Sequence, residues 1–524
     1  MSMVPRVDRA LASFFGFAFV VALCACGQGG SQVEPADSAP PGALLALAVI
    51  PLPLSPAFSP YVHDYVVRCA AGDNPLAITL QATAGAKVTV TTPTATRSEV
   101  SQGLSVTLSE DDPLIVRAVA GGTAESYWVR CLPHDFPQIT FSPYPEAGAP
   151  TPGWYLTGNA IPAEGESGFA MILDGNGTPV WYERVTPGVM NVDLLPDGTV
   201  SYIAMLGDFP LANQYAVQTL APWQTGAVQT VGMVTDIHEL QELPNGDYLV
   251  FSYPLLEGVD LTGLAGGITS VSTLADCVIQ EISPAGGLVW SWRATDHIDP
   301  VKESVLPETD VVNGQTVADV FHCNSIDVDA SGNLLVSARH MDAVFYIDKA
   351  SGTIVWKMGG TAYSKDSAQI ITVVGDPEGT FNYQHDARFQ PNGDVSLFDD
   401  HSNGVGVARG IEYSIDYASG TARPVWQVAA AVNSFAMGSL RRYPDGSNVI
   451  DWGLAAAPAF TEVDDQGNDV LDVGLGGDPA YRTVKVAIGT FDVDILRVTA
   501  GYHGVVVEDA GSPEDGAAAD TAGE

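Results

Sequence analysis

The stretch Asp348-Lys-Ala-Ser-Gly-Thr-Ile-Val-Trp356 joins an acidic turn residue and a glycine to a short apolar strand that ends in Val-Trp. Related stretches occur at 174–181, 283–290 and 416–426. They alternate with hairpin turns, mostly Pro-Asp-Gly or Pro-Asn-Gly, which favour tight hairpins because these positions need a positive φ. The turns end at Gly198, Gly246, Gly332, Gly393 and Gly446. About four strands per unit, in roughly six units, are typical of a propeller. The sequence therefore predicts an all-β fold with a six-bladed β-propeller over residues 150–507.

The composition limits the possible partners. The chain has 524 residues, of which 62 are Asp or Glu and 22 are Lys or Arg, so its formal net charge is −40. Such an excess of negative charge repels phosphate backbones, and no nucleic-acid partner is expected. Hydrophobic residues make up 46% of the chain, which is too large a share for a disordered protein. Only the acidic, Ala- and Gly-rich residues 508–524 are expected to form a disordered tail.

The N-terminal segment resembles a targeting signal. An apolar run from Leu11 to Leu23 follows two arginines and is too short to span a bilayer. It continues into Cys-Ala-Cys26-Gly, which resembles a bacterial lipobox. We therefore expect a lipoprotein signal peptide at 1–25, lipidation of Cys26 and a flexible tether at 26–42. The protein would be a cell-envelope lipoprotein, periplasm-facing or anchored in the outer membrane, with the lipid as its membrane contact. Plain signal cleavage without lipidation is the alternative.

Residues 43–135 contain short alternating strands, a pattern typical of a small β-sandwich. The segment from Leu54 to Tyr65 resembles the cadherin-like sandwich repeat of bacterial surface proteins. Cys69 ends an early strand and Cys131 ends the last one. Neighbouring terminal strands would bring these two cysteines within bridging distance, so we expect a structural disulfide between them. No group of cysteines and histidines has the spacing of a zinc site, so no metal is expected.

The repeat register brings polar residues of different units to one structural position. His238, Asn324 and His385 each lie eight residues before the hairpin glycine of their unit. His322 lies two residues before Asn324 and therefore shares its side of the strand. If this strand is the innermost of each unit, the side chains converge on the central channel. Arg339, flanked by apolar residues, would supply an interior cation.

These residues lie within motifs that resemble the bacterial arylsulfotransferase (aryl-sulfate sulfotransferase) family. The motifs are Ile237-His238-Glu239, His322-Cys-Asn324, Ser337-Ala-Arg339-His340 and Gln384-His385-Asp386. The resemblance covers most of residues 150–500. It implies an N-terminal β-sandwich on a six-bladed propeller in the periplasm, with a small-molecule aryl sulfate and a phenol as substrates and no cofactor. A homodimer stays open, as does the question whether Cys277 and Cys323 form a disulfide.

The resemblance assigns the catalytic roles by motif. His385 corresponds to the histidine that receives the sulfuryl group, while His238, His322, Asn324 and Arg339 correspond to the groups that hold the sulfate. A neutral imidazole is a competent nucleophile, and sulfuryl transfer mainly requires positioning and charge neutralisation. We therefore expect His385 to attack sulfur and form a sulfohistidine, which then passes the group to an acceptor phenol. Either His238 or His322 would protonate the leaving phenol.

Two other functions are compatible with a propeller. A quinoprotein dehydrogenase also has Asp-x-x-x-Gly-x-x-x-Trp repeats, but it normally has more blades and a disulfide between adjacent cysteines, which this chain lacks. A non-catalytic surface propeller that binds glycan or protein would suit the lipid anchor and the sandwich, although the in-register polar residues argue against it. The segment Asp399-Asp400-His401 is expected at a solvated blade edge, and His340 at a blade rim.

Overall fold

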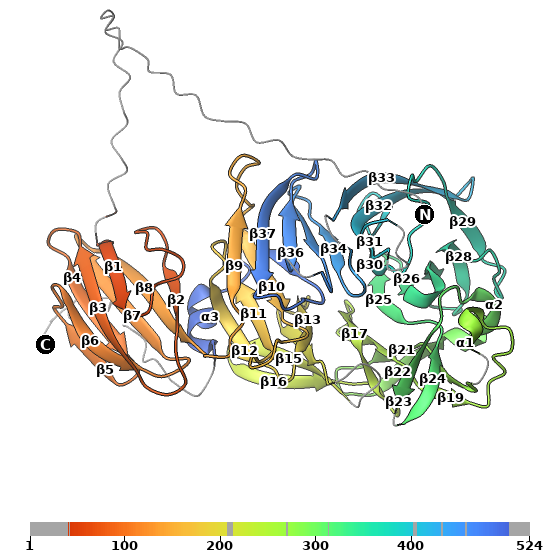
Figure 1. Cartoon of the computed structure of the whole chain (residues 1–524), viewed down its shortest axis with the longest axis horizontal. Helices are drawn as coiled ribbons and strands as arrows, with labels where there is room; N and C mark the ends of the chain where they lie inside the picture. Colours follow the sequence, from red (N-terminus) through yellow and green to blue (C-terminus); the bar gives the residue numbers. More distant parts are fainter. Residues whose placement is uncertain are drawn as a thin grey trace, which may run out of the picture.

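The structure of the protein is a computed structural model that describes residues 40, 42–206, 213–268, 271–312, 314–401, 406–430, 433–455 and 458–501. The regular secondary structure of this part of the chain consists almost entirely of strands, with a few short helices, which confirms the expected all-β class (Figure 1). None of its helices has the length and apolar character needed to cross a bilayer. The expected signal peptide, Cys26, almost all of the tether and the acidic tail lie outside the described residues.

The N-terminal region, at one end of the molecule in Figure 1, consists of two sheets. One sheet contains β1 (Leu44–Ile50), β3 (Asn74–Ala82) and β6 (Gly103–Leu108). The other contains, in spatial order, β2 (Asp64–Arg68), β8 (Thr123–Leu132), β7 (Pro113–Ala120), β4 (Lys87–Thr92) and β5 (Ala95–Ser98). Apolar side chains of both sheets, such as Leu47 and Val116, share one buried core. A disulfide joins Cys69 to Cys131, because β2 and β8 are parallel neighbours that end side by side.

The rest of the described chain contains six four-stranded antiparallel units, some of which are joined or extended by a further strand. The first three are β38 (Val484–Ala487) with β10 (Gly153–Gly158), β11 (Phe169–Leu173) and β12 (Pro179–Arg184); β13 (Val189–Leu194), β14 (Val200–Ala204), β15 (Tyr215–Leu220) and β16 (Trp223–Val228); and β17 (Thr235–Glu242), β18 (Tyr248–Ser252), β21 (Val278–Ile282) and β22 (Leu288–Arg293). The others are β25 (Cys323–Val328), β26 (Leu334–Ala338), β27 (Ala343–Ile347) and β28 (Ile354–Gly359); β30 (His385–Phe389), β31 (Val395–Asp399), β32 (Arg409–Asp416) and β33 (Thr421–Ala429); and β34 (Ser439–Arg442), β35 (Asn448–Asp451), β36 (Phe460–Val463) and β37 (Asp469–Leu475).

The remaining elements connect or extend these units. Strand β29 (Gln369–Val373) lies between β28 and β33. An inserted sheet follows the order β19 (Leu255–Glu257), β20 (Thr273–Ala275), β24 (Gln315–Asp319) and β23 (Glu308–Val312). The short helices are η1 (Ala265–Gly267), α1 (Ala294–His297), α2 (Pro300–Glu303), η2 (Arg339–Met341) and α3 (Val493–Thr499). A second disulfide, Cys277–Cys323, joins the loop after β20 to the start of β25.

The repeat motifs occupy the positions that the sequence predicts. The five hairpin glycines lie between the first and second strands of their units, with φ between +83° and +90°. The Val-Trp stretches form the fourth strands β12, β22, β28 and β33. One difference concerns the boundary at residue 150, because β9 (Ile139–Pro143) pairs with β37. The hairpin repeat carries no signal for this added strand.

We call the first-named strand of each unit its inner strand. A buried ion cluster, which we call the central ion cluster, ties these inner strands together. It consists of Glu239 on β17, Asp386 and Arg388 on β30, Arg441 on β34 and Arg482 just before β38. Arg388 lies 2.5 Å from Glu239 and 2.7 Å from Asp386, and Arg482 lies 2.9 Å from Glu239. Through further hydrogen bonds the cluster also reaches β13 and β25. All six inner strands are therefore held at the centre by one set of charges.

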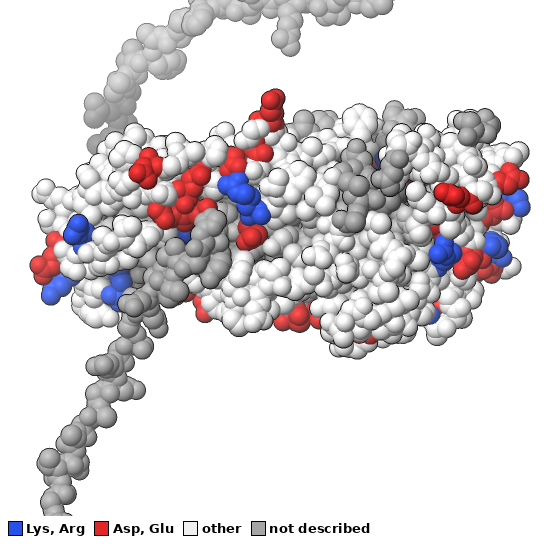
Figure 2. Space-filling model, turned by 90° about the horizontal axis from the view of Figure 1, so that it is seen from below, with Lys and Arg blue, Asp and Glu red and all other residues white. Residues whose placement is uncertain are grey.

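On the face drawn in Figure 2, charged side chains lie over the left half of the molecule and at its right end, with a mostly uncharged stretch between them. The contact between the N-terminal region and the rest uses charge as well, because Arg497 on α3 lies 2.7 Å from Asp64 on β2. Arg130 on β8 also donates to the carbonyl oxygen of Arg497. Helix α3 therefore fastens the two regions to each other (Figure 1).

Removing one charge from the central ion cluster should destabilise the fold. In Glu239→Gln, Arg388 and Arg482 keep their buried charges but lose a carboxylate partner, so the free energy of unfolding should fall by about 3–5 kcal/mol. Urea unfolding followed by tryptophan fluorescence measures the change. The control is Glu257→Gln, at the exposed residue of β19, which should stay within about 0.5 kcal/mol of the parent. Equal stabilities of the two variants would contradict a structural role for the cluster.

Candidate active site

The histidines named from the repeat register lie around one end of the inner strands. His238 projects from β17, His322 immediately precedes β25, and His385 begins β30. The ring centroids of His238 and His322 are 4.9 Å apart. His385 is 2% exposed and lies within the electrostatic reach of both His238 and Arg339. Three separate units therefore bring their imidazoles and one guanidinium into a common buried region.

Each of these imidazoles has its Nδ1 atom beside an aspartate. The distances are 2.8 Å from His238 to Asp236 and 2.5 Å from His322 to Asp319. Burial lowers the pKa of His322 well below its usual value, although Asp319 opposes the shift. A neutral His322 that donates from Nδ1 presents an unprotonated Nε2 atom.

The hydrogen-bond partners of His385 fix its tautomer. Its Nδ1 atom lies 2.6 Å from Asp400 Oδ2 and 3.1 Å from the carbonyl oxygen of Tyr383. Burial raises the pKa of Asp400, and the Arg339 charge opposes that shift. A carbonyl oxygen can only accept, so the hydrogen is on Nδ1. Burial, followed by Arg339, lowers the pKa of His385 well below its usual value. His385 is thus neutral, with its lone pair on Nε2.

Arg339 is the buried cation of the site. Its NH1 donates to His340 Nε2 at 2.6 Å, and its NH2 donates to the carbonyl oxygen of Phe435 at 2.9 Å. The Tyr383 ring lies 4.1 Å from the guanidinium carbon. Among the described residues, Nε of Arg339 has no hydrogen-bond partner although it is buried. Nε therefore keeps an unused hydrogen-bond donor within the site.

Asn324 lies beside the backbone of the candidate nucleophile. Its side chain is fully buried and donates to the carbonyl oxygen of Gln384 at 2.7 Å. Gln384 directly precedes His385, so Asn324 fixes the backbone beside the candidate nucleophile. This geometry favours a positioning role over direct contact with sulfate.

The sequence suggests the wrong environment for Asp400, His401 and His340, and it does not single out Asp319. Asp400 and His401 are buried rather than at a solvated edge, and His340 is 1% exposed rather than at a rim. Asp400 ends up at His385 because β31 returns antiparallel to β30. The pattern of His385 and Asp400 across one hairpin was available as a signal. Asp319 lies in the inserted sheet, outside the repeat, and had no such signal.

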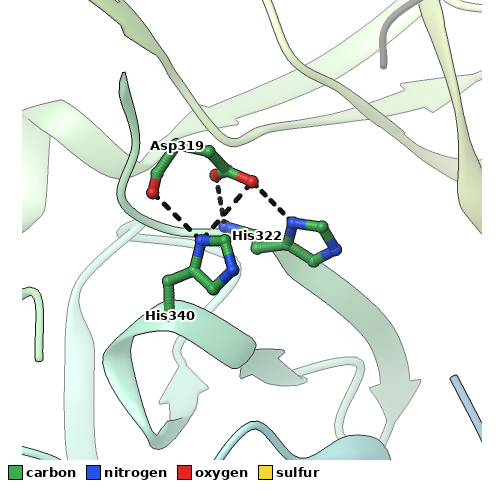
Figure 3. Close-up of side chains that lie close together, drawn as sticks. All are labelled: Asp319, His322 and His340. Atoms are coloured by element: carbon green, nitrogen blue, oxygen red, sulfur yellow. Dashed lines mark hydrogen bonds and ion pairs between the residues drawn. The ribbon is translucent and has the colours of Figure 1, made fainter. Parts of the chain in front are cut away.

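The group Asp319, His322 and His340 has the composition of a metal site, with both imidazoles turned towards the carboxylate (Figure 3). Its hydrogen bonds do not suit a metal. His340 donates from Nδ1 to the Asp319 carbonyl oxygen at 3.0 Å, and its Nε2 accepts from Arg339. A metal on Nδ1 would move the hydrogen to Nε2, where it would face the N–H of Arg339. His322 and His340 instead hold the pKa of Asp319 well below its usual value, against the effect of burial.

Residues 212–476, which include every site residue named above, match the family model described as arylsulfotransferase (ASST). The chain belongs to the arylsulfotransferase family. No curated protein matches this arylsulfotransferase-family chain significantly.

Among solved structures, a protein of unknown function from Bacteroides caccae is 14% identical, with a TM-score of 0.40, over 64% of this chain and 99% of its own. TolB from Acinetobacter baumannii is 8% identical, with a TM-score of 0.35, over 72% and 80%. Virginiamycin B lyase from Staphylococcus aureus is 10% identical, with a TM-score of 0.30, over 67% and 99%.

The hydrogen-bond pattern around Asp319 predicts that the folded arylsulfotransferase-family protein holds no metal there. Dialysis against a chelator should leave the thermal unfolding midpoint unchanged, and elemental analysis should find less than one equivalent of zinc. The opposite result would be one equivalent of zinc in the parent protein, its loss in Asp319→Asn and a lower unfolding midpoint after chelation. Together these outcomes would show that Asp319, His322 and His340 bind a metal.

Proposed function

We propose that the protein transfers a sulfuryl group from an aryl sulfate to a phenolic acceptor through a sulfohistidine at His385, without a nucleotide or metal. The observation that carries this proposal is the geometry at His385, whose Nδ1 lies 2.6 Å from Asp400 Oδ2 and 3.1 Å from the Tyr383 carbonyl oxygen, which leaves Nε2 for the attack. Membership of the arylsulfotransferase family supports the reaction class.

The first half-reaction forms an N–S bond and breaks an S–O bond. The lone pair on His385 Nε2 attacks sulfur, and the phenolate leaves with the electrons of the S–O bond. Arg339 offers its Nε hydrogen to a sulfuryl oxygen, as an oxyanion donor does. One well-aimed donor of this kind contributes about 3 kcal/mol to transition-state stabilisation. Asp400 keeps the hydrogen of His385 on Nδ1 throughout.

The proton passes through the His238–His322 pair. Nδ1 of His238 lies 2.8 Å from Asp236, and its ring centroid lies 4.9 Å from that of His322. In its imidazolium form His238 donates a proton to the leaving phenolate, and the Asp236 carboxylate offsets the charge. In the second half-reaction the pair removes a proton from the acceptor phenol, whose oxygen attacks sulfur and releases His385. The donor and the acceptor therefore react in turn, in a ping-pong sequence.

We further propose that the six four-stranded units are the blades of a six-bladed β-propeller and that residues 43–135 form a cadherin-like β-sandwich. The hairpin glycines and the inner-strand contacts support the propeller, and the shared core of the two N-terminal sheets supports the sandwich. Cleavage after residue 25 and lipidation of Cys26 would anchor the protein in the cell envelope, where disulfides are stable. A nucleic-acid partner does not suit the net charge.

Incubation with an aryl sulfate should add one sulfuryl group to His385, detected by mass spectrometry as an acid-labile adduct. His385→Ala should lose the adduct and at least about 10³-fold in kcat, because the nucleophile is absent. The control is His297→Gln, since His297 also has Nδ1 beside a carboxylate, Asp366 at 2.8 Å, but lies at α1 outside the site. Unchanged activity in His385→Ala would eliminate the mechanism. Sulfate-dependent thermal stabilisation without any turnover would favour a binding propeller.

Asp400→Asn tests the tautomer of His385. The new amide can donate to Nδ1 and so drive the hydrogen to Nε2, which removes the nucleophilic lone pair. We expect kcat to fall about 10³- to 10⁴-fold with little change in KM, as for other carboxylate-to-amide changes behind a catalytic histidine. Asp366→Asn, the same change beside His297, should retain activity. A KM effect alone would mean that Asp400 only shapes the binding pocket.

A further inference from the structure

The inserted hairpin β23–β24 brings two carboxylates to the site, and they differ in exposure. Glu308 and Asp319 are paired residues of this hairpin. The Asp319 side chain is 1% exposed, whereas the Glu308 side chain is 51% exposed. Asp319 is held by two imidazoles, so the two carboxylates have different chemical roles.

Glu308 reaches the edge of the buried cation. Its Oε1 lies 3.4 Å from Arg339 NH1, and its Oε2 lies 3.7 Å from His340 Nε2. Burial, and next the charge of Glu308, raise the pKa of Tyr383, whose ring lies beneath the guanidinium. The Glu308 carboxylate thus lies among Arg339, His340 and Tyr383.

Apart from its buried Nε, Arg339 has little other room for an anion. Its NH2 is bound to the Phe435 carbonyl, and the Tyr383 ring covers one face of the guanidinium. Within the described part of the chain, Glu308 is the acidic residue that forms an ion pair with Arg339. An incoming anion that binds the NH1 edge must therefore displace the Glu308 carboxylate.

We propose that Glu308 is a displaceable counter-ion that occupies the anion position on Arg339 until a sulfate group replaces it. For an aryl sulfate the inference rests on the proposed function, whereas for inorganic sulfate it rests on geometry alone. A half-exposed ion pair at 3.4 Å is weak, so displacing it costs little. A sulfate group can accept two charge-assisted hydrogen bonds from a guanidinium and so compensate for the loss. Glu308 thereby lowers the apparent affinity of the site for an anion, because the anion must first displace its carboxylate.

The test compares the parent with Glu308→Gln, which keeps the shape of the side chain but removes its charge. The dissociation constant for inorganic sulfate, measured by calorimetry at fixed ionic strength, should fall about two- to fivefold, the size of one exposed ion pair. The KM for 4-nitrophenyl sulfate should fall by a similar factor, with kcat unchanged. Glu308→Asp, which retains the charge on a shorter side chain, should bind sulfate with intermediate affinity.

Glu257→Gln is the matched control, because it removes one exposed negative charge from β19 of the same inserted sheet. Sulfate affinity that improves equally in both variants would overturn the proposal, since the effect would then be long-range charge alone. Weaker sulfate binding in Glu308→Gln would also overturn it and would make Glu308 a support for Arg339. If no variant turns over an aryl sulfate, the proposed function fails, but the sulfate calorimetry still decides the role of Glu308.

Discussion

The candidate site depends on the central ion cluster, because the cluster residues follow the site residues directly in the chain. Glu239 follows His238 on β17, and Asp386 follows His385 on β30. Arg482 reaches both carboxylates and also donates to the backbone carbonyl of Asn324. Paired buried charges are costly to separate, so the inner strands have one stable register around the centre. That register places the imidazoles next to one another.

A second set of carboxylates acts on the imidazoles themselves. Asp236, Asp319 and Asp400 each lie beside the Nδ1 atom of one site histidine. An imidazole held in this way directs its Nε2 atom away from the carboxylate, which leaves that nitrogen for chemistry. At the site, buried aspartates of this acidic chain therefore determine which nitrogen of each histidine can react.

The sequence predicts those residues of the site that share a position in the repeat. His238, Asn324 and His385 share one register position, so counting back from the hairpin glycine was enough to group them. Asp400 directly follows β31, and its contact with His385 depends on the bulge between β30 and β31. Asp319 belongs to an insertion without periodicity. Neither contact follows from the repeat register, because the first depends on a local bulge and the second on how the inserted sheet packs against the repeat.

The inserted hairpin shows how burial alone can separate two carboxylates by function. Asp319 is enclosed, so its charge persists only because His322 and His340 are there to share it, and it is committed to orienting them. Glu308 is half exposed to solvent, and its bond to Arg339 is therefore exchangeable. If Arg339 formed ion pairs only with buried carboxylates, its charge would be permanently neutralised. Placing the counter-ion on an exposed strand instead keeps Arg339 paired when the site is empty and available when an anion arrives.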